Sequence, residues 1–88
     1  MKNKDIIREA AIKAGIITEK EAAELENAGT EIPFHTASGW RQKGYSVREG
    51  ESGVEVKLWK RKETGEGFYL AKAYLYSFDQ VEEEGNPA

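Results

Sequence analysis

The sequence predicts a single α+β domain with two N-terminal helices, a short third helix and a small antiparallel sheet built on a long C-terminal β-hairpin. Three observations lead to this expectation. Apolar residues recur at helical spacing in residues 1–29, they alternate with polar residues after Tyr45, and a glycine-bearing turn divides the alternating part in two. A chain of 88 residues forms one hydrophobic core and leaves no room for a second.

A first helix is expected over residues 5–14. Its apolar residues fall on one stripe, which consists of Ile6, Ile7, Ala10, Ala11 and Ala14. Asn3 has a side chain suited to an N-cap, and Gly15 is suited to the C′ position that follows a helix. Both ends of this helix are therefore marked in the sequence.

A second helix is expected after Thr18. The Thr18 hydroxyl and the Glu21 carboxylate have the spacing of a capping box, in which each accepts a hydrogen bond from a free backbone amide of the other residue. Gly29 is expected to end this helix. The side chains expected to point inward are Ala22, Leu25 and Ala28.

Residues 30–33 are expected to be a linker, because Pro33 favours extended backbone at the preceding residue. A third helix of about two turns is expected to start at a Thr36 cap and to end at Gly44. Trp40 is the only large apolar residue of that helix. We therefore expect Trp40 to be the structural anchor that holds the helix to the body.

The remaining elements are strands and loops. Residues 45–47 are expected to be extended, and 48–53 to form a glycine-bearing loop. Residues 54–60 and 68–78 both alternate, and the turn at 63–67 joins them into a hairpin. Residues 30–81 thus hold the third helix and the hairpin, and residues 82–88 are expected to be an acidic, frayed tail.

Positive charge and tryptophan are concentrated in one third of the chain. Residues 35–62 hold seven Lys/Arg, three acids and both tryptophans, although the whole chain has a formal net charge of −3. Phosphate backbones are attracted to such a region by charge, and bases stack on its rings. The alternative is a solvated basic hairpin without a ligand.

The alternation along the hairpin predicts which charged and aromatic side chains share a face. One face of the first strand carries Glu55, Lys57, Trp59 and Arg61, and the second strand contributes Lys72, Tyr74 and Tyr76. If these sets share one face, that face mixes rings with cations. In the alternative interpretation, helices cover both faces and the rings are core. The candidate nucleic-acid-binding residues are Arg48, Lys57, Trp59, Lys60, Arg61, Lys72, Tyr74 and Tyr76.

Catalytic and metal-binding patterns are missing from the sequence. It has no cysteine, and His35 is its only histidine, so neither an HExxH zinc site nor a Cys nucleophile is present. No serine stands in a nucleophile-elbow context. We expect a non-enzyme without cofactor, metal or small-molecule substrate. We also expect it in the cytoplasm, because the sequence has no cysteine, no signal peptide and no apolar segment that could span a membrane.

A series of motif residues resembles the N-terminal domain of ArdC-type antirestriction proteins and small stand-alone relatives from phages and plasmids. The series consists of His35-Thr36, Trp40, Gly44-Tyr45-Ser46-Val47, Gly50-Glu51, Leu58-Trp59-Lys60 and Phe78-Asp79-Gln80-Val81. The resemblance covers about residues 30–82. It implies an α+β domain that binds single-stranded DNA and helps a mobile element evade restriction.

The resemblance also implies site positions, and it has two departures. The positions carried over are Trp40, Arg48, Lys57, Trp59 and Lys60. Full-length ArdC-type proteins carry a metalloprotease-like domain with an HExxH motif, and these 88 residues contain no such motif. The sequence also has Glu49-Gly50-Glu51 where the family usually has Lys-Gly-Glu.

Three functions are compatible with the sequence. The first is single-stranded nucleic-acid binding in antirestriction or transfer of a mobile element. The second is inhibition of a host defence nuclease, anti-CRISPR-like, by protein–protein contact through the acidic flanks. The third is an interaction module without a nucleic-acid role. Binding to single-stranded oligonucleotides across a salt series distinguishes the first from the other two.

Overall fold

The structure is a computed structural model that describes residues 2–84. It confirms the predicted α+β class, with two N-terminal helices, a short third helix and a small antiparallel sheet near the C-terminus. In chain order the elements are α1 (Asn3–Lys13), α2 (Glu19–Asn27), β1 (Phe34–His35), α3 (Ala37–Gln42), β2 (Tyr45–Val47), β3 (Val54–Arg61), β4 (Phe68–Ser77), the 3-10 turn η1 (Phe78–Gln80) and β5 (Val81–Glu83).

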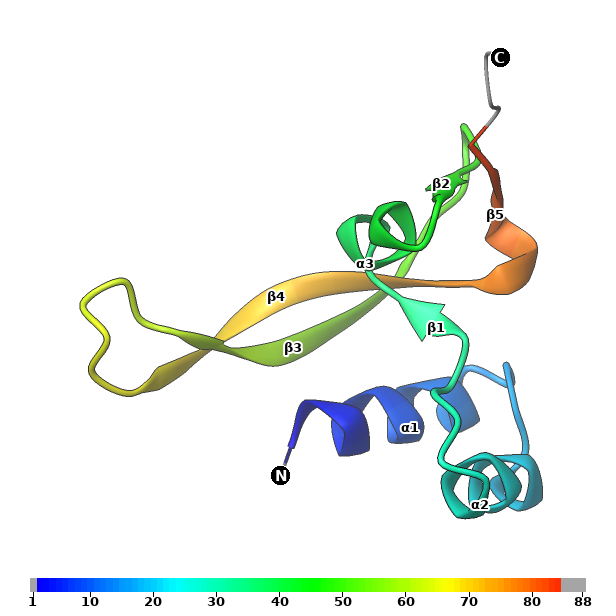
Figure 1. Cartoon of the computed structure of the whole chain (residues 1–88), viewed down its shortest axis with the longest axis horizontal. Helices are drawn as coiled ribbons and strands as arrows, with labels where there is room; N and C mark the ends of the chain where they lie inside the picture. The colour runs from blue at the N-terminus through cyan, green and yellow to red at the C-terminus, as the bar shows by residue number, and fades with distance from the viewer. Residues whose placement is uncertain (1, 85–88) are drawn as a thin grey trace.

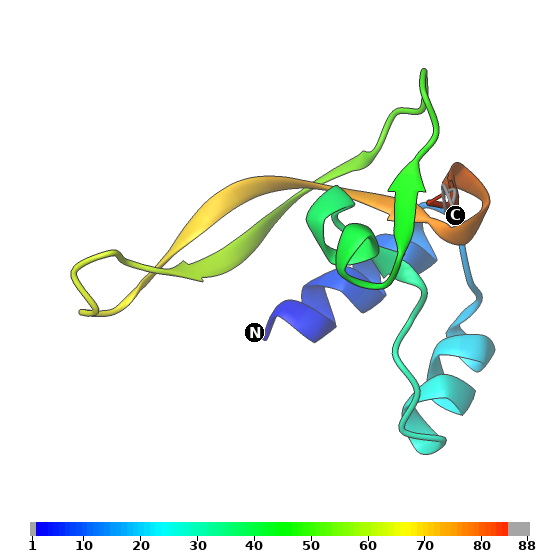
Figure 2. The ribbon, with the colours of Figure 1, turned by 45° about the horizontal axis from the view of Figure 1, so that its top comes forward.

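The long β3–β4 hairpin is the central element of the fold. It extends to one side of the molecule, with α1 below it and α3, β2 and β5 gathered at the end distant from its turn (Figures 1 and 2). The strand order of the main sheet is β1-β4-β3, so β3 is an edge strand. The strands β2 and β5 form a separate antiparallel pair.

One face of the hairpin is covered by α1. Val54, Val56 and Leu58 of β3 pack on a core that contains the fully buried residues Phe34 and Leu75. Ala11 of α1 completes that core, and Ile7 packs against it. The inward apolar set of β3 and the stripe of α1 are therefore the two surfaces that meet.

The helix ends follow the local signals except at the start of α1. Lys2, and not Asn3, is its N-cap residue, so the predicted Asn3 cap is wrong. The Asn3 side chain instead bonds to the backbone of β3. At the other end, Gly15 has φ 75°, and the N–H of Ile16 donates to the carbonyl of Ala11 at 2.9 Å. This is a Schellman ending, which favours glycine at that position.

The capping box of α2 is confirmed. The Glu21 N–H donates to Thr18 Oγ1 at 3.1 Å, and the Thr18 N–H donates to Glu21 Oε1 at 2.9 Å. Ala22 is buried and Leu25 half-buried, as predicted, but Ala28 is exposed because the helix is already ending there.

Two strand pairings were not predicted. Phe34 and His35 pair with Ser77 and Tyr76, so the two residues that follow the expected linker form a short strand. Residues 81–83 pair with β2, so the expectation of a frayed tail from Glu82 is wrong for this part. Pairing satisfies backbone groups that would otherwise need water. Residues 85–88 of the predicted tail lie outside the described residues.

Among residues 2–84, no helix has the length and apolar character needed to cross a membrane.

Candidate nucleic-acid interface

The register of the hairpin decides which side chains share a face. In β3 and β4, directly opposed residues point to the same side of the ribbon. The pairs Glu55–Tyr74, Lys57–Lys72, Trp59–Leu70 and Arg61–Phe68 are directly opposed. We call these eight residues the open face. The predicted cationic and aromatic sets therefore do lie on one face.

The open face is not covered by a helix. Its large apolar side chains are 40–60% exposed: Trp59 40%, Tyr74 45%, Leu70 47% and Phe68 60%. The interpretation in which helices cover both faces is wrong for this part of the hairpin. Only the opposite face, with Val54, Val56 and Leu58, packs against the core.

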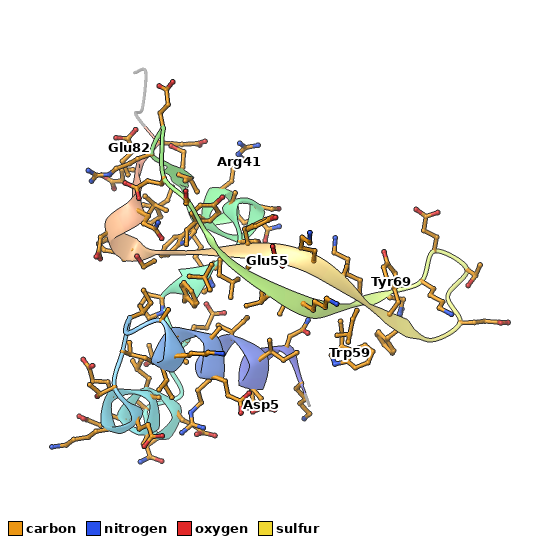
Figure 3. All side chains as sticks on the ribbon, turned by 180° about the vertical axis from the view of Figure 1, so that it is seen from behind. Asp5, Arg41, Glu55, Trp59, Tyr69 and Glu82 are labelled. Carbon is orange, nitrogen blue, oxygen red and sulfur yellow. The ribbon has the colours of Figure 1, made fainter. Side chains whose placement is uncertain are left out.

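The ribbon twists along its length. Trp59 points to the side of α1, and Tyr69, its neighbour across the strand pair on the opposite face, points away from α1 (Figure 3). Strongly twisted two-stranded ribbons turn their faces in this way. A ligand that followed the open face would therefore wind around the hairpin.

Two lysines oppose each other on the open face. Lys57 and Lys72 are cross-strand partners, and like charges in that arrangement repel. Lys72 Nζ lies 4.0 Å from Glu55 Oε1, which is a long and exposed contact. Among the described residues, Lys57 forms no ion pair. An anion placed between the two ammonium groups would relieve this repulsion.

Glu55 and Arg61 complete the polar part of the open face. The Tyr74 hydroxyl donates to Glu55 Oε1 at 3.5 Å, a distance at which the bond is weak. Arg61 Cζ lies 5.8 Å from the centroid of the Phe68 ring, within cation–π range. Arg61 is therefore held over an aromatic ring at the distal end of the hairpin.

Five of the eight predicted site residues belong to the open face, and three do not. Lys57, Trp59, Arg61, Lys72 and Tyr74 lie on it. Lys60 is opposed to Tyr69 on the other face, so the structure does not bring its side chain together with that of Trp59. Residues at odd-numbered and even-numbered positions of one strand point to opposite faces of the sheet.

Arg48 and Tyr76 lie nearer the body. Arg48 Nε donates to the carbonyl of Val81 at 3.3 Å, so this side chain ties the loop after β2 to β5. Tyr76 is half-buried, and its ring lies against Gly53. Its backbone carbonyl accepts a hydrogen bond from Trp40 Nε1 at 2.8 Å.

Leu70 and Phe68 are members of the open face that the predicted site lacked. Both alternate with the inward residues of β4 in the same way as Lys72 and Tyr74. The period-two pattern was the signal that could have identified them.

The motif residues around Trp40 form an aromatic cluster. The Trp40 ring is 3% exposed and lies 4.8 Å from His35, 5.4 Å from Tyr45 and 6.0 Å from Phe78, measured between ring centroids. Tyr45 and Phe78 are 5.6 Å apart. Trp40 has the burial expected of an anchor. The cluster joins α3 to both strand pairs.

His35 and Glu31 lie at the edge of this cluster, and the pKa of each is lowered for a different physical reason. Burial lowers the pKa of His35 below its usual value, although Glu31 lies 3.7 Å away. The hydrogen bond and charge of Lys43, 3.0 Å from the Glu31 carboxylate, lower the pKa of Glu31. His35 is thus held in its neutral form beside an ionised acid.

Among the described residues, no group of three or more His, Cys, Asp or Glu side chains is arranged to hold a metal ion.

No protein-family model matches the chain, and neither a curated protein nor a solved structure gives a significant match. The resemblance to the ArdC-type N-terminal domain therefore rests on the motif residues and stays a prediction.

Proposed function

We propose that this protein is a non-enzymatic single-stranded nucleic-acid-binding protein and that the open face is its contact surface. The observation that carries the proposal is the register of the hairpin, which opposes Lys57 to Lys72 and flanks them with the exposed rings of Trp59 and Tyr74. Phosphates supply the missing counter-charge, and bases supply surfaces for the rings.

Single strands fit this surface better than duplexes. Stacking of a base on an aromatic side chain contributes about 1–3 kcal/mol, and a duplex hides the base faces that stacking requires. The cations of the open face are few, and the chain has a net charge of −3. We therefore expect modest affinity that decreases steeply as salt increases.

The resemblance of residues 30–82 extends the proposal. It favours DNA as the natural strand and a role in evading host restriction, inside the cytoplasm of a host cell. The motif residues that form the Trp40 cluster would then support the hairpin, while the open face contacts the strand.

A second candidate function is inhibition of a basic host defence protein. The observation that favours it is α2, on which Glu19, Glu21, Glu24 and Glu26 are all exposed, with a single lysine between them. Such a surface is complementary to a cationic nucleic-acid groove on another protein.

Fluorescence anisotropy with labelled oligothymidine, as single strand and as duplex with oligoadenosine, tests the proposal. The titration is made at low salt and then across a salt series. Wild type should bind the single strand more tightly than the duplex. Trp59→Ala should weaken binding by about 1–3 kcal/mol with an unchanged salt slope. Lys57→Ala should weaken it and reduce the slope by about 0.7.

The chain supplies a matched control for each variant. Tyr69→Ala removes an aromatic ring that is 44% exposed on the opposite face, and Lys60→Ala removes a cation there. Both controls should bind as wild type does. If wild type does not bind at low salt, or if Tyr69→Ala loses as much as Trp59→Ala, the open face is not the contact surface. The first outcome favours the inhibitor.

A further inference from the structure

A groove of about 340 Å³ lies between α1, α2 and the segment that leads from α2 into β1. Figure 1 shows where these three elements lie in the fold. None of the open-face residues lines it. Ile7, Ala22, Ile32 and Phe34 form its apolar lining, and charged side chains from α1, α2 and the linking segment surround them. Its volume is at the lower end of the range for small-ligand sites.

Arg8 lines this groove with an unsatisfied donor. The Nε atom of Arg8 is buried and has no hydrogen-bond partner. Among the described residues, no carboxylate oxygen lies within 4.0 Å of its guanidinium nitrogens. A buried donor of a charged group without an acceptor costs free energy, and such groups are uncommon in native structures. Arg8 therefore brings to the groove a cation that has no carboxylate partner, and an acceptor at its terminal guanidinium nitrogens would stabilise it.

The acids of the groove leave Arg8 available. Glu31 is engaged by Lys43, whose Nζ lies 3.0 Å from its carboxylate. Asp5 accepts a hydrogen bond from the Lys2 backbone N–H at 3.2 Å, at the start of α1. Lys4, one helical turn from Arg8, adds a second cation to the same side. Glu26 is the remaining carboxylate, and its negative charge repels an anionic ligand. A ligand with one negative charge therefore fits better than a ligand with two.

We propose that this groove binds a carboxylate that is attached to an apolar group. The guanidinium would hold the carboxylate through charge-assisted hydrogen bonds, in the paired geometry that arginine favours. The apolar group would cover Ile7, Ile32 and Phe34 and displace water from them. A free organic acid and the C-terminal carboxylate of a peptide both have this chemistry.

Chemical-shift titration of the ¹⁵N-labelled full chain tests this proposal. The probes are 3-phenylpropanoate for a free acid and N-acetyl-Gly-Phe for a peptide end. The controls are the corresponding carboxamides, in which a neutral amide group replaces the carboxylate. Each acid that binds should shift the backbone amide signals of residues 7, 8, 32, 34 and 35, with saturation in the millimolar range. The carboxamide controls should bind about tenfold more weakly than the acids, because they lose a hydrogen bond between charged groups.

Variants locate the carboxylate. Arg8→Gln should lower the affinity of the acid about tenfold and leave the affinity of the amide unchanged. Arg41→Gln makes the same charge change at an exposed position of α3, outside the groove, and should have no effect. A folded spectrum of each variant establishes that the groove is intact, and Arg8→Lys, which keeps the charge, should retain part of the affinity if Arg8→Gln is unfolded.

The results separate the sources and the proposals. Binding by 3-phenylpropanoate alone identifies a free acid, and binding by the peptide acid alone identifies a chain end. Equal binding of acid and amide, no saturation by any probe, or an unchanged affinity in Arg8→Gln overturns the proposal. Oligonucleotide binding to the hairpin is independent of all these outcomes.

Discussion

The side chain of Asn3 holds the backbone of Trp59. The Trp59 N–H donates to Asn3 Oδ1 at 2.7 Å, and Asn3 Nδ2 donates to the Trp59 carbonyl at 3.1 Å. One amide thus pairs with both polar groups of an edge-strand residue, as a neighbouring strand would. The first turn of α1 thereby fixes the strand that carries Trp59, the one tryptophan of the open face.

Asn3→Ala should therefore lower the free energy of unfolding by about 1–2 kcal/mol, because two hydrogen bonds are lost. Urea denaturation measures the change. The freed edge of β3 should also promote self-association, which sedimentation velocity detects. Asn27→Ala is the matched control, since Asn27 is an exposed residue at the end of α2. Equal stability of the two variants would show that the Asn3 bonds contribute nothing.

Trp40→Ala should destabilise the domain by roughly 3–5 kcal/mol. The ring is 3% exposed and is the centre of the aromatic cluster. Trp40→Phe should destabilise the domain less than Trp40→Ala, because the Phe ring retains apolar contacts. It should still be less stable than wild type, because the Tyr76 carbonyl loses the indole N–H donor. Thermal denaturation followed by circular dichroism ranks the variants. A melting temperature of Trp40→Ala equal to that of wild type would contradict the anchoring role.

Gly53→Ala should destabilise the start of the hairpin by about 1–3 kcal/mol. A Cβ atom at this position would lie 2.9 Å from Tyr74 Cβ and 2.9 Å from Tyr76 Cζ, with the Leu75 carbonyl oxygen at 3.1 Å. The backbone oxygen cannot move away cheaply, so the clash is not relieved by ring rotation alone. Ser52→Ala, one residue earlier and exposed, is the control. Denaturant unfolding of both variants checks this, and it fails if they are equally stable.

Stability should depend on pH through His35. Because burial lowers the pKa of His35 in the folded state, the unfolded chain binds the proton more readily than the folded chain. The contribution of neutral His35 is therefore complete above about pH 6.5, the usual pKa, and is lost as the pH falls through the folded-state pKa. The charges that face this imidazole are Glu31 and Lys43.

His35→Gln should remove this pH dependence. Urea denaturation of wild type and variant between pH 7.5 and the acid limit of reversible folding measures it. Glu31, whose pKa is also lowered, loses its contribution only at more acidic pH, so the two effects fall in different windows. A wild-type stability that does not decrease as the pH falls below about 6.5 would contradict the argument.

Local signals predicted the elements, and long-range contacts decided the rest. The Thr18 and Thr36 caps and the two alternating segments were readable, because each depends on residues close in sequence. The role of Asn3 was not, because its partner lies 56 residues away. The pairing of β2 with β5 was missed for the same reason. In the site, parity along β3 already excluded Lys60 from the face of Trp59, and only the exposure of that face required the structure.

Glu55→Gln should tighten oligonucleotide binding, which no loss of folding would imitate. Glu55 places a negative charge on the open face, 4.0 Å from Lys72 and within hydrogen-bond reach of Tyr74. Removing that charge frees Lys72 and eliminates repulsion of a phosphate. Exposed ion pairs of this kind correspond to up to about a fivefold change in affinity.

Glu63→Gln, in the turn, removes one acid outside the open face and serves as the control. Anisotropy titrations at low salt compare the two. The gain should be larger for Glu55→Gln and should diminish as salt is added. If both variants gain equally, the effect is one of net charge, and the open face has no special place in binding.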